Sequence, residues 1–167
     1  AEIAGALVVH GGAKSYDTVY GNDRLKVEIQ KAKDRLFGAW CIVPLGEPGF
    51  FDTGEDLIGA MADEDIRAVR FVPGGFSLHP EVVGETLEVL AQNRILTLME
   101  VGWGLPSIFP VFHDLLSSFP DLPVLLTDHV WSQQRHIHKL MSLHDNLHIE
   151  FSSYQINRGI EHYVADF

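Results

Sequence analysis

Six short apolar segments recur along this chain at nearly regular spacing, and their recurrence constrains the fold more than any other feature. The segments cover residues 6–9, 40–43, 66–72, 95–101, 123–126 and 147–151. Most are continuously apolar, which is typical of strands buried on both faces of a parallel sheet. Strand starts near residues 38, 66, 94 and 122 are about 28 residues apart, which is the length of a compact βαβ repeat.

Amphipathic helical patterns lie between these segments. The clearest stripe consists of Leu25, Ile29, Ala32 and Leu36, which predicts a helix reaching residue 36. Further stripes cover residues 57–61, 82–90 and 108–119. Thr53 precedes one of them, and its hydroxyl is expected to cap the first turn of that helix. The alternating order predicts an α/β fold of about six strand–helix units.

The composition and the net charge exclude several classes of protein. The 167 residues are 46% hydrophobic and 21% charged, as in globular proteins with a core. A formal net charge of -11 argues against binding to nucleic acid or anionic membranes. Every apolar run is shorter than the roughly 18 residues of a membrane-spanning helix. The single cysteine, Cys41, lies in an apolar run, and no secretory signal pattern is visible, so we expect a cytoplasmic protein.

Two parallel architectures fit this pattern. Six strands and the short length favour an open doubly wound sheet, whereas a (β/α)8 barrel has eight strands and about 250 residues. Gly11 and Gly12 follow the first segment without the glycine spacing of a dinucleotide site, so no such cofactor is expected. In either architecture, ligands bind beyond the carboxyl ends of the strands.

Several segments carry a more specific resemblance. They are residues 6–10, 21–25, 35–44, 66–71, 119–126 and 146–152. On these segments the chain resembles the TIM-barrel amidohydrolases of the decarboxylase-like branch, amidohydrolase family 2. The resemblance implies a single amidohydrolase-like (β/α) barrel domain over residues 1–167, incomplete, with strands two to seven of the barrel. The first strand, with its His-x-His metal pair, and the last, with a catalytic aspartate, would be absent.

The resemblance also implies an activity and a cofactor. It predicts a metal-dependent hydrolase or decarboxylase for a small polar or carboxylated substrate, with zinc as the expected divalent metal. Glu100 stands where the family has a metal-binding histidine, and either Asp128 or His129 stands at the next such position. Glu100 and His129 are therefore the candidate ligands. A rebuilt metal site and a metal-free relative both remain open.

The remaining candidates lie late on strands or directly after them. Asp128 and His129 are candidate acid–base groups, because histidine titrates near neutrality and desolvation shifts carboxylates. Arg70 is suited to orienting a substrate carboxylate, or else to pairing with Glu100 or Asp128. His10, Trp103 and Trp131 are candidate substrate contacts. His136-Ile-His138 has the His-x-His spacing of a metal pair, but its neighbours Ile137, Leu140 and Met141 form a helical stripe. Residues two apart on a helix face in different directions, so no metal pair is expected there.

A function of another class is also compatible with the sequence. A catalytically silent partial barrel would expose two sheet edges, and exposed edges pair readily with another copy. Such a binding or assembly module would form a homo-oligomer. A metal-independent binder of sugar acids or lactones is a third interpretation.

Overall fold

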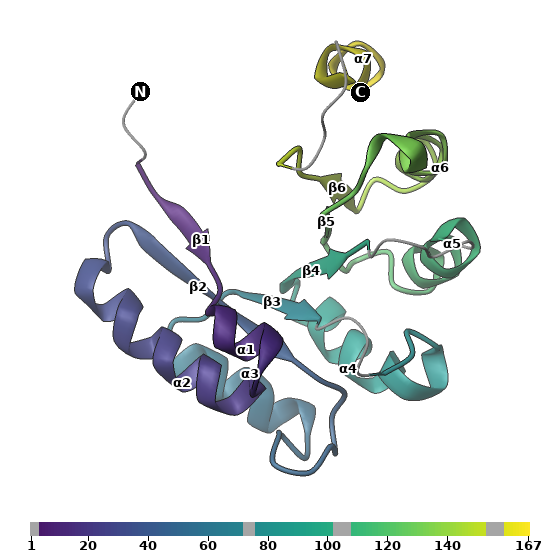
Figure 1. Ribbon diagram of the computed structural model, residues 1–167. Coiled ribbons are helices and arrows are strands. Elements are labelled where there is room, and N and C mark those ends of the chain that lie inside the picture. The colour runs from purple at the N-terminus through teal and green to yellow at the C-terminus, as the bar shows by residue number, and fades with distance from the viewer. Residues whose placement is uncertain (1–3, 72–75, 102–107, 153–158) are drawn as a thin grey trace.

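The computed structural model describes residues 4–71, 76–101, 108–152 and 159–167, which form one parallel sheet with helices between the strands (Figure 1). The strands are β1 (Ala6–Val8), β2 (Leu36–Ile42), β3 (Ala68–Phe71), β4 (Leu96–Glu100), β5 (Val124–Thr127) and β6 (Leu147–Ile149). The α-helices are α1 (Gly11–Ser15), α2 (Thr18–Ile29), α3 (Gly54–Asp63), α4 (Pro80–Gln92), α5 (Ile108–Ser118), α6 (Gln134–Met141) and α7 (Gly159–Asp166). Two 3-10 turns, η1 (Gln30–Ala32) and η2 (Trp131–Gln133), complete the described elements.

The sheet is a curled half-barrel with its helices on the outside, and the edges formed by β1 and β6 stand apart (Figure 1). The six strands follow one another in chain order. A doubly wound sheet would instead reverse its strand order at a switch point. The fold is therefore an incomplete α/β barrel. Across the described ranges, no helix is long and apolar enough to cross a membrane.

The outer face of the sheet carries the main hydrophobic core. Alternate strand residues such as Trp40, Val69, Met99 and Leu126 are buried there against the helices. These side chains point outward because successive residues of a strand face opposite sides of the sheet. The helices contribute buried residues to the same cluster, among them Leu25, Leu57, Leu87, Phe112 and Leu140.

The inner face of the sheet carries a smaller apolar cluster and, nearer the carboxyl ends of the strands, charged side chains. Ala39, Ala68 and Leu98 form that cluster, with Leu125 packed against it. Further toward the carboxyl ends of the strands, the inward positions become polar. Arg70 aligns with Leu98 in the β3–β4 register, and Glu100 follows Leu98 by two residues on the same face of β4.

Of two local predictions from the sequence, the Thr53 helix cap is confirmed and the helix reaching Leu36 is wrong. Thr53 caps α3 as expected, since its hydroxyl accepts a hydrogen bond from the Asp56 backbone N–H at 3.2 Å. The expected helix over Leu36 is wrong, because α2 ends at Ile29 and Leu36 belongs to β2. Leu36 pairs with Ala6 in the β1–β2 ladder, so sheet pairing outweighs the helical spacing.

A buried amide ties α2 to β2 just beyond the short β1 ladder. The Asn22 side chain donates to the Cys41 carbonyl at 2.7 Å and accepts from the Cys41 N–H at 3.0 Å. Cys41 is in register with Arg70 of β3, but the β1 ladder on its other side ends at Val8 and Gly38. Asn22 therefore satisfies backbone groups of Cys41 that β1 does not reach, as buried backbone groups require.

Candidate functional site

A cluster of charged side chains lies at the carboxyl ends of the central strands, on the inner side of the half-barrel. Arg70 comes from β3, Glu100 is the last residue of β4, and Asp128 directly follows β5. Lys14 joins them from α1. This is the edge of the sheet at which parallel α/β folds bind their ligands.

Arg70 holds two carboxylates at once. Its Nη2 lies 2.9 Å from Glu100 Oε2 and 3.1 Å from Asp128 Oδ2. The side chains of Arg70 and Glu100 are 12% and 15% exposed, whereas that of Asp128 is 42% exposed. The structure thus shows the pairing that the sequence left open for Arg70, and it places Asp128 on the solvent side of the cluster.

Lys14 reaches the same carboxylate from the other side of the cluster. Its Nζ lies 2.7 Å from Glu100 Oε2. The position of Lys14 depends on α1, whose N-cap is His10: the His10 Nδ1 accepts a hydrogen bond from the Gly12 N–H at 3.1 Å. His10, a predicted substrate contact, therefore caps the short helix that carries Lys14.

Asp128 adopts an unusual backbone conformation. Its φ of 57° lies in the left-handed region, which is strained for most residues but tolerated by aspartate. Its N–H donates to Glu150 Oε1 at 2.8 Å, and Glu150 Oε2 accepts from the Ser152 N–H at 2.7 Å. Glu150 thereby anchors the backbone turn that directs the Asp128 side chain toward Arg70.

His129 occupies a different environment. Its side chain is completely buried, and its ring lies edge-on to Phe151 at 6.1 Å between ring centroids. Burial lowers the pKa of His129 below its ordinary value of 6.5, against the opposing effect of the Glu150 carboxylate. The structure therefore answers which of the adjacent pair meets Arg70: it is Asp128, while His129 is a buried imidazole that favours the neutral form.

The two partly buried glutamates of this region, Glu100 and Glu150, are stabilised as carboxylates. Burial alone raises the pKa of Glu100, but hydrogen bonds from Lys14 and Arg70 outweigh it and hold this pKa below its ordinary 4.5. Burial also raises the pKa of Glu150, but hydrogen bonds from Ser152 and from the Asp128 backbone outweigh this effect, so the pKa of Glu150 lies below its ordinary 4.5. The cluster therefore contains ionised acids held by cations and backbone N–H groups.

These donors do not fit a divalent metal ion in their present arrangement. Glu100 Oε2 already accepts from two cationic groups, Lys14 and Arg70, and an added ion would meet both positive charges at close range. His129 is buried against Phe151. Within the described ranges, no three His, Cys, Asp or Glu side chains are grouped so that they could hold a metal. Metal ligation by Glu100 and His129 stays a prediction.

The structure describes neither of the two tryptophan side chains that were predicted to contact the substrate. Trp103 lies outside the described residues. Trp131 is the first residue of η2, which follows the turn after β5. Both remain predicted substrate contacts.

Two residues of this region were not predicted from the sequence: Lys14 of the cluster, and Glu150, which supports Asp128. Glu150 had a usable signal, because it is a charged residue at the end of an apolar segment, as Glu100 is. Lys14 had none, since it lies in a short polar stretch and acquires its role only when α1 folds over the sheet edge.

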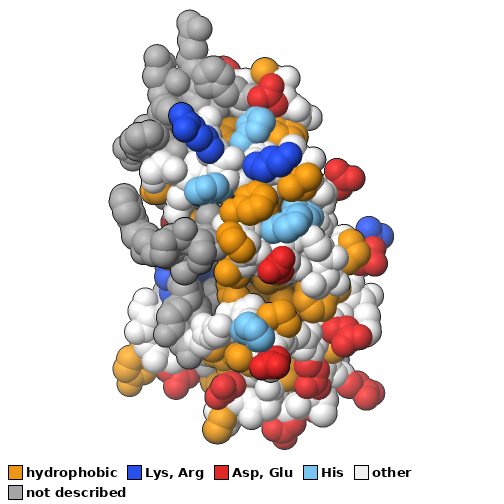
Figure 2. All heavy atoms as spheres, turned by 90° about the vertical axis from the view of Figure 1, so that its right-hand side faces the viewer, with side chains coloured by type: hydrophobic (Ala, Val, Ile, Leu, Met, Phe, Trp, Pro, Cys, Tyr) orange, Lys and Arg blue, Asp and Glu red, His pale blue; other side chains and the backbone are white. Residues whose placement is uncertain are grey.

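Several histidines lie away from this cluster, on the outer helices and in the segment that follows α6. Figure 2 shows histidine side chains among hydrophobic and acidic ones on the face that forms the right-hand side of Figure 1. His113 of α5 and His144 share a hydrogen bond at 2.8 Å, and His138 of α6 lies 2.8 Å from Asp166 of α7. His136 and His138 do lie on a helix, α6, as their apolar neighbours predicted.

Comparison with solved structures agrees with the fold. The chain resembles an uncharacterised TIM-barrel protein of Bordetella bronchiseptica at 15% identity and TM-score 0.68, covering 97% of this chain and 60% of that one. A dihydroorotase from Campylobacter jejuni matches at 16% identity and TM-score 0.54, over 80% of this chain and 40% of its own. A protein described as amidohydrolase II matches at 12% identity and TM-score 0.51, over 79% and 54%.

These likenesses show a TIM-barrel fold, of which this chain spans between 40% and 60% of each neighbour's length. Neither a protein-family model nor a curated protein matches the chain.

Proposed function

We propose that this chain forms the substrate-binding part of an amidohydrolase-like hydrolase or decarboxylase that acts on a small polar or carboxylated molecule. The observation that carries the proposal is the Arg70–Glu100–Asp128 cluster with Lys14, at the carboxyl ends of the half-barrel strands. Two TIM-barrel neighbours, the dihydroorotase and the amidohydrolase II protein, are consistent with it through their names.

Arg70 supplies the binding step in this proposal. The Arg70 Nε has no hydrogen-bond partner among the described residues, so the guanidinium retains an unused donor. A substrate carboxylate that displaces Asp128 from Nη2 would meet two donors on one edge of the guanidinium, which is the geometry of bidentate recognition. Lys14 and Glu100 would keep the Arg70 side chain in place during this exchange.

Asp128 supplies the proton-transfer step. Once released from Arg70, its carboxylate would accept a proton from a water that attacks the substrate carbonyl, and would return that proton to the leaving group. In a decarboxylation, protonated Asp128 would deliver its proton to the carbon that loses carbon dioxide. The buried neutral His129 is the alternative proton carrier, and His10, Trp103 and Trp131 remain the predicted substrate contacts.

The test compares matched substitutions on a panel of small cyclic amides, lactones and aromatic carboxylic acids, with product formation followed by mass spectrometry. Arg70→Lys keeps the charge but loses the planar fork, so we expect KM to rise by about tenfold or more with a smaller change in kcat. Asp128→Asn should lower kcat instead. Arg67→Lys is the control, because Arg67 pairs with Asp65 on the exposed surface.

Two results would count against this function. Turnover unchanged in both Arg70→Lys and Asp128→Asn would remove these residues from the site. Binding of the carboxylic acids without any turnover, weakened by Arg70→Lys, would favour the second candidate, a non-catalytic binder of carboxylated molecules. The pairing of two cations, Lys14 and Arg70, around one carboxylate favours that alternative, because it places anion-binding groups where a metal would otherwise lie.

A further inference from the structure

A separate cavity lies on the outside of the half-barrel, between α2, β2 and the loop that joins β2 to α3. Its volume is about 190 Å³. It is lined by Val19, Asn22, Asp23, Lys26, Trp40, Gly49, Phe50 and Phe51. None of these residues belongs to the Arg70 cluster, so the cavity is independent of the proposed catalytic site.

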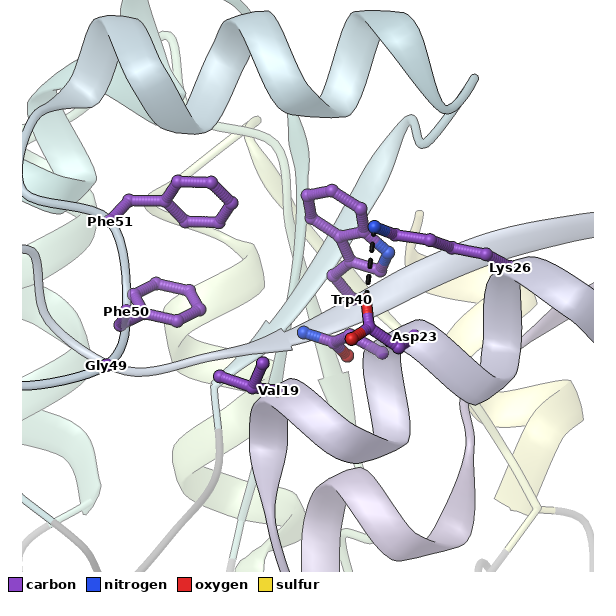
Figure 3. A pocket seen from close by; sticks show the side chains of 8 residues that line it. Val19, Asp23, Lys26, Trp40, Gly49, Phe50 and Phe51 are labelled. Carbon is purple, nitrogen blue, oxygen red and sulfur yellow. Dashed lines mark ion pairs between the residues drawn. The ribbon is translucent and has the colours of Figure 1, made fainter.

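Aromatic side chains make up much of the wall of this cavity. The rings of Trp40 and Phe51 are nearly parallel, with 6.0 Å between centroids and 15° between planes. Phe50 meets Phe51 edge-on at 4.9 Å. Figure 3 shows the two phenyl rings at one end of the cavity and Asp23 with Lys26 at the other, with Trp40 between them. The cavity thus has an apolar end and a polar end.

The Trp40 indole N–H is an unsatisfied donor beside this cavity. Trp40 is only 2% exposed, and its Nε1 is buried without a hydrogen-bond partner among the described residues. A buried donor in this state loses its hydration and gains nothing in return. The Lys26 ammonium lies over the Trp40 ring, 5.2 Å from its centroid, and Lys26 cannot accept a hydrogen bond. An acceptor from a bound molecule would satisfy the indole.

The charges at the polar end restrict the chemistry of that molecule. Lys26 Nζ lies 3.2 Å from Asp23 Oδ1 and 3.5 Å from Glu64 Oε1, so one cation is shared by two carboxylates. This excess of negative charge disfavours a ligand carboxylate. An ammonium is disfavoured as well, because it would present donors to the donor of Trp40. A neutral acceptor meets both conditions.

We propose that this cavity binds a neutral single-ring aromatic molecule with a carbonyl group, its ring against Phe50 and Phe51 and its carbonyl on the Trp40 indole. The volume supports this size, since apolar cavities of about 150 Å³ accommodate benzene. The side chain of Lys26 is 30% exposed and lies at the protein surface, so it can swing aside to let the carbonyl reach Nε1.

The test uses benzamide as the probe and toluene as the matched molecule without an acceptor, with affinities measured by NMR titration of the whole chain. Benzamide should shift the Trp40 indole N–H resonance downfield, as a newly formed hydrogen bond does, and toluene should not. Trp40→Phe should weaken benzamide binding by about fivefold and leave toluene binding unchanged. Benzoate and benzylamine should each bind about tenfold more weakly than benzamide.

Substitutions on α2 provide a control that does not depend on Trp40. Val19 lines the cavity and Val27 does not, yet both are about half exposed on the same helix. Val19→Trp should abolish benzamide binding by filling the cavity, whereas Val27→Trp should retain it, and Arg70→Lys should have no effect. Equal affinity in the two valine variants, or an unshifted Trp40 resonance at the solubility limit of benzamide, would overturn the proposal.

Discussion

The two faces of the same six strands carry opposite kinds of side chain. On the outer face, large residues such as Trp40, Met99 and Leu126 are buried against helices. On the inner face, small residues such as Ala39 and Ala68 give way to charge at the carboxyl ends of the strands. Since successive strand residues alternate between these faces, one backbone provides stability on one side and chemistry on the other.

The largest expected effect tests this division with two neighbouring leucines on β5. Leu126 is completely buried on the outer face, whereas Leu125 is only partly buried on the inner face. Leu126→Ala should lower the free energy of unfolding by about 3 kcal/mol through lost burial and a residual cavity. Leu125→Ala should cost about 1 kcal/mol. Urea unfolding followed by circular dichroism measures both, and equal losses would contradict the contrast between the faces.

The sequence predicted the outer face better than the inner one. Continuous apolar segments identified all six strands, because strands covered by helices need hydrophobic residues at nearly every position. Leu36 was assigned to the wrong element because its spacing also fits a helix, and only pairing with Ala6 in β1 decides between them. A non-local contact of this kind leaves no local signal.

At the candidate site, a charged residue at the end of an apolar segment could be predicted from the sequence, but the residue that forms an ion pair with it could not. Glu100 was identified because it stands where the resembled family has a metal-binding histidine, at the end of an apolar segment where an unpaired carboxylate is costly to bury. Lys14, which pairs with it, lies 86 residues earlier in the chain and carries no pattern of its own. The orientation of Asp128 and His129 could not be predicted from strand alternation, because the left-handed backbone at Asp128 ends that alternation.

An intermediate effect concerns the charge on the inner face and its pH dependence. The pKa of Glu100 in the folded chain lies below its ordinary 4.5, after burial is offset by Lys14 and Arg70. The ionised form therefore contributes stability at pH values above about 4.5, and this contribution is lost as the pH falls through the lower folded pKa. Glu100→Gln should lower the free energy of unfolding by about 1–2 kcal/mol at neutral pH.

The same substitution should make unfolding less sensitive to acid. Between neutral pH and the acid range, the wild-type protein should lose more stability than Glu100→Gln, because the variant has no proton to take up at this position. Glu85→Gln on the exposed side of α4 is the control and should follow the wild type. Parallel stability profiles for the wild type and Glu100→Gln would show that the cluster does not stabilise the carboxylate.

The smallest expected effect separates backbone from charge at Asp128. Asp128→Gly and Asp128→Ala both remove the carboxylate that meets Arg70, but only glycine adopts a φ of 57° without a steric cost. The glycine variant should therefore be the more stable of the two by about 1 kcal/mol, measured by urea unfolding. If the two variants were equally stable, the turn after β5 would relax when the carboxylate is removed. In that case the hydrogen bond from the Asp128 N–H to Glu150 would depend on the Asp128 carboxylate. The ion pair with Arg70 would then fix the backbone turn, and the turn would not be what positions the carboxylate.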